Sequence, residues 1–175
     1  MITKSKEIIL DESKNNIKIS NYVGFLKDIK IKIKSSQIKA AVKVNKELVR
    51  LYWEIGTSLN QKIKEESWGS KVLDKLAKDL KSSFPNMKGF SYRNLKYMVQ
   101  FAKNYCAYEF GQQLVAQIPW GHNVLIMQKI SDSKERLWYI QQTIENSWSR
   151  SFLDHWIDVK LYQRQGKATT NFKNT

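Results

Sequence analysis

The longest regular pattern along the chain is a stripe of mostly apolar positions, at steps of three and four, between residues 36 and 65. Its members are Ile38, Val42, Asn45, Val49, Tyr52, Ile55, Leu59 and Ile63. Positions three and four apart lie on one face of an α-helix, so the stripe predicts a long amphipathic helix that ends near Trp68-Gly69. We expect this helix to be the structural spine of the fold.

The segment before this helix is harder to interpret. Residues 1–17 are polar apart from one Ile-Ile-Leu patch and show no sustained period, which predicts a flexible N-terminal tail. In the sequence DIKIKIK, residues 28–34, apolar and basic positions alternate, and alternation alone indicates a strand. We favour a helix here, because no Gly or Pro separates this stretch from the long helical pattern.

Two shorter helices with a turn between them are predicted over residues 71–84 and 92–105. The first has Ser70 as its N-cap, an apolar face, and a basic face of Lys71, Lys75, Lys78 and Lys81. Pro85 ends it, the sequence PNMKGF forms the connection, and Ser91 is the expected N-cap of the second helix. The order helix, short turn, helix predicts a helix-turn-helix.

The remainder of the chain also favours helices. Residues 107–120 are apolar and low in charge, which fits either a short helix at 112–117 or a small wing. Three further helices are predicted over 121–130, 132–146 and 149–165, with Asp132 and Ser149 as N-caps. The expected fold is therefore all-α: one helical domain over residues 18–165, followed by a linker or a truncated end over 166–175.

The basic charge is concentrated in two stretches. The net charge is +14, and residues 18–50 carry nine Lys and Arg against two acids, while residues 70–105 carry eight against two. Localised positive charge is typical of a protein that binds a polyanion, because each phosphate contact releases counterions. A general bias of the composition toward lysine is the alternative explanation.

The polar face of the predicted 92–105 helix is the candidate DNA-reading surface, because a helix fits the major groove and its first turns meet the base edges. Arg93 is placed to contact guanine, and Asn94 or Gln100 to contact adenine. Phosphate-binding and aromatic contacts complete the predicted set. The predicted DNA-binding residues are Lys71, Lys75, Lys78, Lys88, Ser91, Tyr92, Arg93, Asn94, Lys96, Tyr97, Gln100 and Lys103.

No catalytic, metal or cofactor site is predicted. The acids are scattered: Glu65 and Glu66 are adjacent, and Asp154 and Asp158 are four residues apart. We expect His122 to make a local hydrogen bond, Cys106 to lie in the core, and the six Trp residues to serve mainly in packing. A single Cys excludes an internal disulfide and fits a cytoplasmic location, and no apolar run is long enough for a membrane span.

Five stretches together resemble the N-terminal domain of the YhcG-like family of bacterial proteins, over residues 36–172. They read VNKELVRLYWEIG, SWGSKVLDKLAKDLKSSFPNMKGFSYRNLKYMVQFA, VAQIPWGHNVLI, ERLWYIQQTIENSWSRSFLDHWI and LYQRQGKATTNF. The resemblance implies a winged helix-turn-helix-like DNA-binding domain that precedes a nuclease domain of the PD-(D/E)XK type. It places the recognition helix on residues 89–98, and two further motifs on residues 118–122 and 148–150.

The chain departs from the family pattern in two ways. Ser147 stands where the family usually has Gly, and the acids and lysine of the PD-(D/E)XK motif are absent from these 175 residues. We therefore expect a DNA-binding domain without catalytic activity, whose partners are DNA and a C-terminal nuclease domain that lies outside this chain. The alternative is a protein-interaction or homodimerisation module, suggested by the long helix and the abundant Trp and Tyr.

Overall fold

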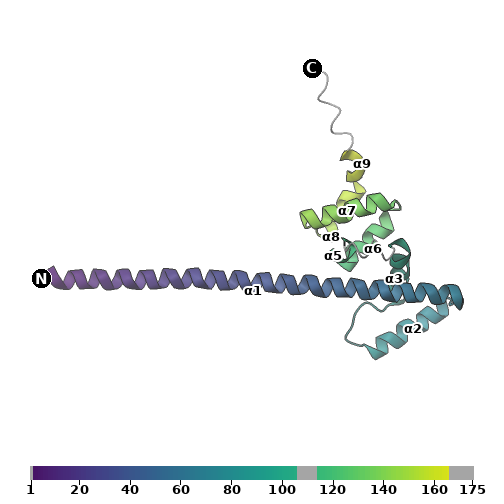
Figure 1. Ribbon diagram of the computed structural model, residues 1–175, viewed down its shortest axis with the longest axis horizontal. Helices are drawn as coiled ribbons and strands as arrows, with labels where there is room; N and C mark the ends of the chain where they lie inside the picture. The colour runs from purple at the N-terminus through teal and green to yellow at the C-terminus, as the bar shows by residue number, and fades with distance from the viewer. Residues whose placement is uncertain (1, 106–113, 166–175) are drawn as a thin grey trace, which may run out of the picture. The chain divides into compact units, whose positions relative to one another are not determined.

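The computed structural model describes residues 2–105 and 114–165, with side chains described from residue 21 onward in those ranges. Every regular element in these ranges is an α-helix (Figure 1), so the predicted all-α fold class is confirmed. The elements are α1 (Ile2–Glu65), α2 (Ser70–Ser83), α3 (Tyr92–Asn104), α5 (Leu114–Gln117), α6 (Trp120–Lys129), α7 (Ser133–Asn146), α8 (Arg150–Asp158) and α9 (Leu161–Gln165).

The chain divides into two compact units, residues 1–43 and residues 44–175. The boundary falls inside α1 and within the segment 18–165 that the sequence analysis treats as one domain. Unit 1 consists of the N-terminal part of α1, and unit 2 contains the rest of α1 together with α2 to α9.

Helix α1 begins much earlier than the sequence pattern predicts. Residues 2–17, expected to form a flexible tail, belong to the helix, and the alternating DIKIKIK stretch is helical as favoured. No Gly or Pro occurs before Gly24, and Ile and Lys are the commonest residues of the early sequence. These residues have adequate to good helix propensity, so local preference supports a helix even without an apolar stripe.

The predicted stripe of α1 is buried only in its second half. Val49, Tyr52 and Leu59 are buried, whereas Ile38 and Val42 are 65% and 52% exposed. The apolar stripe is therefore helical as predicted, but residues 38 and 42 are not covered by another element. A periodic apolar face is buried only where another element covers it.

Two hydrophobic clusters form the core of unit 2, and residues of α1 contribute to both. The first contains Tyr52 and Leu59 of α1 with residues of α2, Phe90 and the first part of α3. The second contains Val49 with the end of α3 and with α5 to α8. Figure 1 shows α2 on one side of the C-terminal part of α1 and α5 to α8 on the other.

Trp120 connects the two clusters, because its ring packs edge-on against members of each. Its ring centroid lies 4.9 Å from that of Tyr52 and 5.1 Å from that of Phe101. Edge-to-face aromatic pairs add a favourable electrostatic contribution to the area that they bury. The family motif at residues 118–122 thus contains a tryptophan with a structural role.

Three of the four predicted N-caps are confirmed. The side chains of Ser91, Asp132 and Ser149 accept hydrogen bonds from the third residue of their helices, which satisfies a backbone N–H that the helix leaves unpaired. Ser70 is instead the first residue of α2, whose N-cap is Gly69 without a side-chain cap.

The single helix predicted over 149–165 is two helices, α8 and α9. The break lies at Lys160, whose φ of 55° is left-handed and incompatible with a continuing α-helix. The Tyr139 hydroxyl stabilises the break: it donates to the Trp156 carbonyl and accepts from the Tyr162 amide at 3.1 and 3.3 Å. The partner residue that makes the break favourable is thus distant in sequence.

The sequence of residues 107–120 fits either a short helix or a small wing. In the structure, residues 114–117 form a helix, α5. The remaining residues of that stretch before 114, and the predicted linker at 166–175, lie outside the described residues. Ser147, where the resemblance to the YhcG-like family implies a Gly, has a φ of 52° as the C-cap of α7. A glycine adopts that conformation without steric cost, so the implied Gly would fit this backbone.

Candidate nucleic-acid interface

Helix α3 presents four polar side chains along one exposed face. Arg93, Lys96, Gln100 and Lys103 are all exposed. Their spacing of three, four and three residues places them in one row, which spans about 15 Å at 1.5 Å per residue. The buried side chains of α3, Leu95, Met98, Val99 and Phe101, face the core.

The cations of the exposed row are not paired with acids among the described residues. Helix α3 contains no Asp or Glu. Within the described ranges, Arg93, Lys96 and Lys103 form no ion pair, and the Lys96 ammonium lies 5.7 Å from the centre of the Tyr92 ring. A cation over an aromatic face is attracted to the ring, so Tyr92 helps to orient Lys96. Lys88 is likewise exposed, in the connection before α3.

Asn94 does not have the role that the sequence predicts. Its Nδ2 donates to the Gly89 carbonyl, and its Oδ1 accepts from the Trp120 indole N–H at 2.7 Å. Its amide therefore has hydrogen-bond partners on both sides and is not free to contact a base. Asn94 is a positioning residue that ties the start of α3 to the connection before it and to Trp120.

The connection before α3 is held in place by α1. Gly89 has a φ of +113°, and a Cβ there would lie only 2.0 Å from the Tyr52 hydroxyl oxygen. That hydroxyl donates to the Lys88 carbonyl at 3.3 Å. Both constraints require Gly at this position and fix the backbone that carries Lys88 and leads into the Ser91 cap.

Tyr97 is half-buried, and its hydroxyl accepts a hydrogen bond from Gln128 of α6. The sequence pattern predicts Tyr97 on the free polar face of α3 and gives no indication of Gln128. The structure therefore adds Gln128, an exposed amide on the neighbouring helix, to the candidate surface. The helical periodicity of α3 alone gives no signal for it, because it depends on the packing of α6 against α3.

The basic face of α2 is less strongly charged than its lysine count suggests. Lys75 pairs with Asp79 at 3.0 Å, and Lys78 pairs with Asp74 at 2.7 Å. The hydrogen bond to Asp74 raises the pKa of Lys78. Only Lys71 among the three predicted contacts of α2 is exposed without an ion pair in the part of the chain that the structure describes.

Lys96, Gln100 and Lys103 also border a shallow groove. The rest of its lining comes from three helices: Tyr97 and Val99 of α3, Leu73 of α2 and Ile63 of α1. The groove thus has an apolar base and a basic rim. Such a surface can accept a group with an anionic part and a flat or apolar part.

The comparisons with known proteins give a family. A family model described as the DUF1016 N-terminal domain matches residues 28–164, which is most of the chain. This chain belongs to the DUF1016 N-terminal domain family. That family is YhcG-like, in agreement with the resemblance seen in the sequence. No curated protein and no solved structure matches the chain.

In this member of the DUF1016 N-terminal domain family, the motif at residues 118–122 is built into the core. Two asparagine amides hold its backbone: Asn45 and Asn123 both donate to the Ile118 carbonyl, at 3.1 and 3.4 Å. His122 is buried, and its Nε2 donates to the Trp148 carbonyl at 3.0 Å. The motif therefore joins α5, α6 and the connection that precedes α8, and we assign it a structural role.

Three acids of the described residues are held in ion pairs with lysines. Asp154 and Asp158 both bind Lys129, at 2.5 and 2.6 Å, and Glu66 pairs with Lys62 at 2.6 Å. Within the described ranges, no three His, Cys, Asp or Glu side chains gather as a metal site would require.

Among the helices described, none combines the length and apolar composition needed to cross a membrane. Cys106 lies outside the described residues.

Proposed function

We propose that this chain is a DNA-binding domain and that the exposed row of α3 is its main contact surface. One observation carries the proposal: Arg93, Lys96, Gln100 and Lys103 form an exposed row on a helix without acids. Arg and Gln are the side chains that bind guanine and adenine edges bidentately, and Lys binds phosphates. The N-terminal end of α3, at the Ser91 cap, also favours a phosphate through the helix dipole.

In this proposal α2 and α3 act as a helix-turn-helix with α3 as the recognition helix. The connection, residues 84–91, is longer than the roughly three- to four-residue turn of the usual motif, so the pair is a variant of it. The core of unit 2 fixes α3 against α1 and α2 and leaves its polar row exposed. Lys71 and Lys88 flank the row as phosphate contacts, and Lys75 and Lys78 contribute less because acids already pair with them.

The resemblance to the YhcG-like family suggests a role for DNA binding. The domain would hold a nuclease domain of the PD-(D/E)XK type on its substrate, and the cleavage chemistry would belong to that other domain. No catalytic residue is assigned in this chain. A cytoplasmic location fits this role.

The test is a titration of a fluorescently labelled DNA duplex at low salt, read by anisotropy. The variant Arg93→Ala/Lys96→Ala should bind more weakly by about 1–3 kcal/mol, which is roughly fivefold to more than a hundredfold in Kd. The matched control is Lys134→Ala/Arg164→Ala, which removes the same two residue types from exposed positions on α7 and α9.

Two further measurements complete the experiment. Thermal melting followed by circular dichroism shows whether each variant remains folded, and single-stranded and junction probes show which DNA form binds most tightly. If both double variants bind duplex as strongly as the wild-type chain, or lose binding to the same extent, the assignment of the surface to α3 is wrong.

A further inference from the structure

Unit 1 is a helix whose large apolar side chains are exposed to solvent. Among the described side chains of residues 21–43, only Leu26 and Ile29 are half-buried, and all others are exposed. Tyr22, Phe25 and Ile33 are 64%, 65% and 52% exposed. Exposed apolar side chains at this density are uncommon on a monomeric protein and indicate an interaction surface.

Some of the apolar residues of unit 1 fit a seven-residue repeat, whereas others, such as Val23, Phe25, Ile31 and Ile38, lie outside its a and d positions. In a heptad labelled a to g, Ile19, Leu26, Ile33 and Ala40 occupy position a, and Tyr22, Ile29 and Ser36 occupy position d. Apolar residues at a and d over three heptads are typical of a coiled coil, in which one helix packs its seam against the same seam of another. The next seam positions are Lys43, Glu47 and Arg50, so the seam ends where unit 2 begins at residue 44.

The charges beside the seam favour a second copy of this chain in one orientation. In a parallel, in-register pair, position g of one helix faces position e of the next heptad on its partner. These pairs are Phe25 with Lys30, Lys32 with Gln37, and Lys39 with Val44, so no lysine faces a lysine. An antiparallel pairing of the same seam has two possible registers: one sets Lys30 against Lys30 and Lys32 against Lys32, and the other sets Lys18 against Lys39, so both are repulsive.

We infer that residues 19–40 of α1 form a parallel two-stranded coiled coil with the same residues of a second copy of this chain. Leu26, Ile29 and Ile33 provide the core of the seam, and Ser36 is a polar position within it. The inference does not depend on DNA binding, because it uses unit 1 and the proposed DNA surface lies in unit 2.

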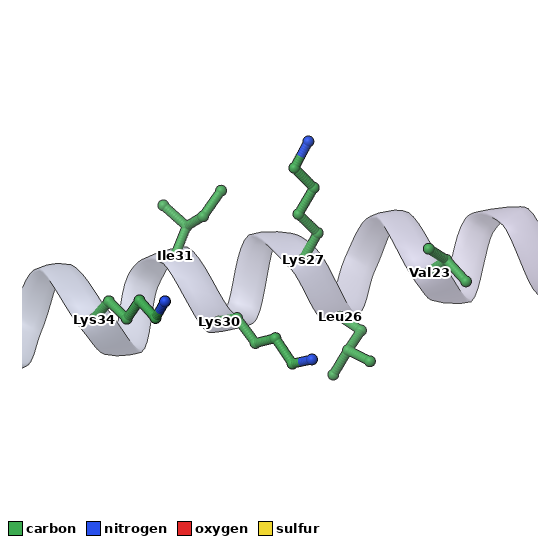
Figure 2. A pocket seen from close by; sticks show the side chains of 6 residues that line it. All are labelled: Val23, Leu26, Lys27, Lys30, Ile31 and Lys34. Carbon is green, nitrogen blue, oxygen red and sulfur yellow. The ribbon is translucent and has the colours of Figure 1, made fainter.

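The opposite side of the helix supplies a matched control. Ile31 occupies position f, and Figure 2 shows its side chain leaving the helix on the opposite side from Leu26. Ile31 and Ile33 are the same residue type, two positions apart, and their exposed fractions of 55% and 52% are nearly equal. Figure 2 also shows a shallow groove along this part of α1, which is lined in part by Lys27, Lys30 and Lys34. These three lysines lie at heptad positions b and e, outside the seam.

The first test measures the mass of the full chain by sedimentation at increasing protein concentration. Each chain has a mass of 20.6 kDa, and the wild-type chain should approach twice that value. Ile33→Asp should shift the chain to a monomer, whereas Ile31→Asp should leave the dimer intact, because only position 33 is in the seam. A wild-type chain that stays monomeric, or a dimer that Ile31→Asp disrupts as strongly as Ile33→Asp, overturns the inference.

The second test examines the alignment of the two helices, in a chain with Cys106 replaced by Ser. Ile29→Cys places a thiol at a d position, where two parallel, in-register copies bring it close to its equivalent. Mild oxidation should link most of this variant into a covalent dimer, and Ile31→Cys should give little product. Loss of the Ile29→Cys link while the dimer persists in sedimentation overturns the parallel alignment.

Discussion

Asn94 determines how the start of α3 is held. Its amide joins the Gly89 carbonyl and the Trp120 indole, and Trp120 in turn packs against Tyr52 and Phe101. An amide with hydrogen-bond partners on both its oxygen and its nitrogen is costly to disturb, because each half-buried partner would be left unsatisfied. The residue therefore serves the proposed DNA surface indirectly, by fixing the direction of the helix that carries it.

His122 makes the stability of the protein depend on pH. Burial of the imidazole, aided by the nearby charge of Arg150, lowers its pKa, and the hydrogen bond to the Trp148 carbonyl only partly opposes this. In the unfolded chain the pKa returns to about 6.5. As the pH falls through this value the unfolded state takes up the proton first, so stability is lost between about pH 6.5 and the lower pKa of the folded state.

The prediction is that the melting temperature falls as the pH is lowered from about 7.5 to about 5.5, before the carboxylates dominate the acid range. His122→Gln should flatten this part of the profile, whatever its effect on stability at pH 7.5. His155→Gln, which changes the exposed histidine, should leave the slope in place. If His122→Gln and the wild-type chain have the same slope, the buried imidazole is not its source.

At the scale of the helices, Gly56 sets the distance between α1 and α3. A Cβ at residue 56 would lie 2.0 Å from the Met98 carbonyl oxygen and 2.4 Å from its carbonyl carbon. Both atoms belong to the backbone of α3, which cannot move aside without shifting the helix. The Gly in the middle of α1 is therefore required by a close approach of two helices.

Two Gly→Ala variants of the same helix should have opposite effects. Gly24→Ala meets no atom within 4 Å, so it should strengthen α1 by up to about 1 kcal/mol through helix propensity. Gly56→Ala gains the same propensity but must separate α1 from α3, so it should destabilise unit 2 by about 1–3 kcal/mol, as overpacking typically does. Chemical denaturation of both variants checks the prediction, and a stabilising Gly56→Ala would contradict the close approach.

The sequence predicts the helices of this fold well, and it predicts contacts between them poorly. The row Arg93, Lys96 and Gln100 could be predicted because exposure follows the 3.6-residue period within one helix. Asn94 could not, because its partner Trp120 lies 26 residues away and on another helix. The break at Lys160 likewise depends on the Tyr139 hydroxyl, which no local pattern reveals.

The stripe of α1 shows the same distinction over a longer distance. Periodicity correctly predicts that residues 38–63 are helical and share a face, but it gives no information about which elements cover that face. Val49 and Tyr52 are covered by the clusters of unit 2, and Ile38 and Val42 are exposed. The candidate surface was incomplete for the same reason, since Gln128 joins it through the packing of α6 against α3.

At the scale of the whole molecule, the two basic stretches of the chain correspond to two different proposals. The lysines of unit 1 flank an apolar seam, and the cations of α3 stand on a polar row of unit 2. Positive charge should oppose the pairing of two unit 1 helices, because both helices are positively charged. Positive charge should promote the binding of DNA to α3, because DNA is negatively charged. Added salt should therefore have opposite effects on self-association and on DNA binding.

The final prediction is that added salt weakens DNA binding and strengthens self-association of the same protein. The four lysines proposed to bind phosphates, Lys71, Lys88, Lys96 and Lys103, give a slope of about −3 to −4 for the logarithm of the DNA-binding constant against that of the salt concentration. Screening of the lysines beside the seam should lower the dimer dissociation constant over the same range. Anisotropy with the Ile33→Asp variant isolates the first effect, and sedimentation of the wild-type chain without DNA isolates the second. A DNA slope near zero would contradict only the α3 surface, and a dimer that salt dissociates would contradict only the coiled coil, since the two measurements use different parts of the chain.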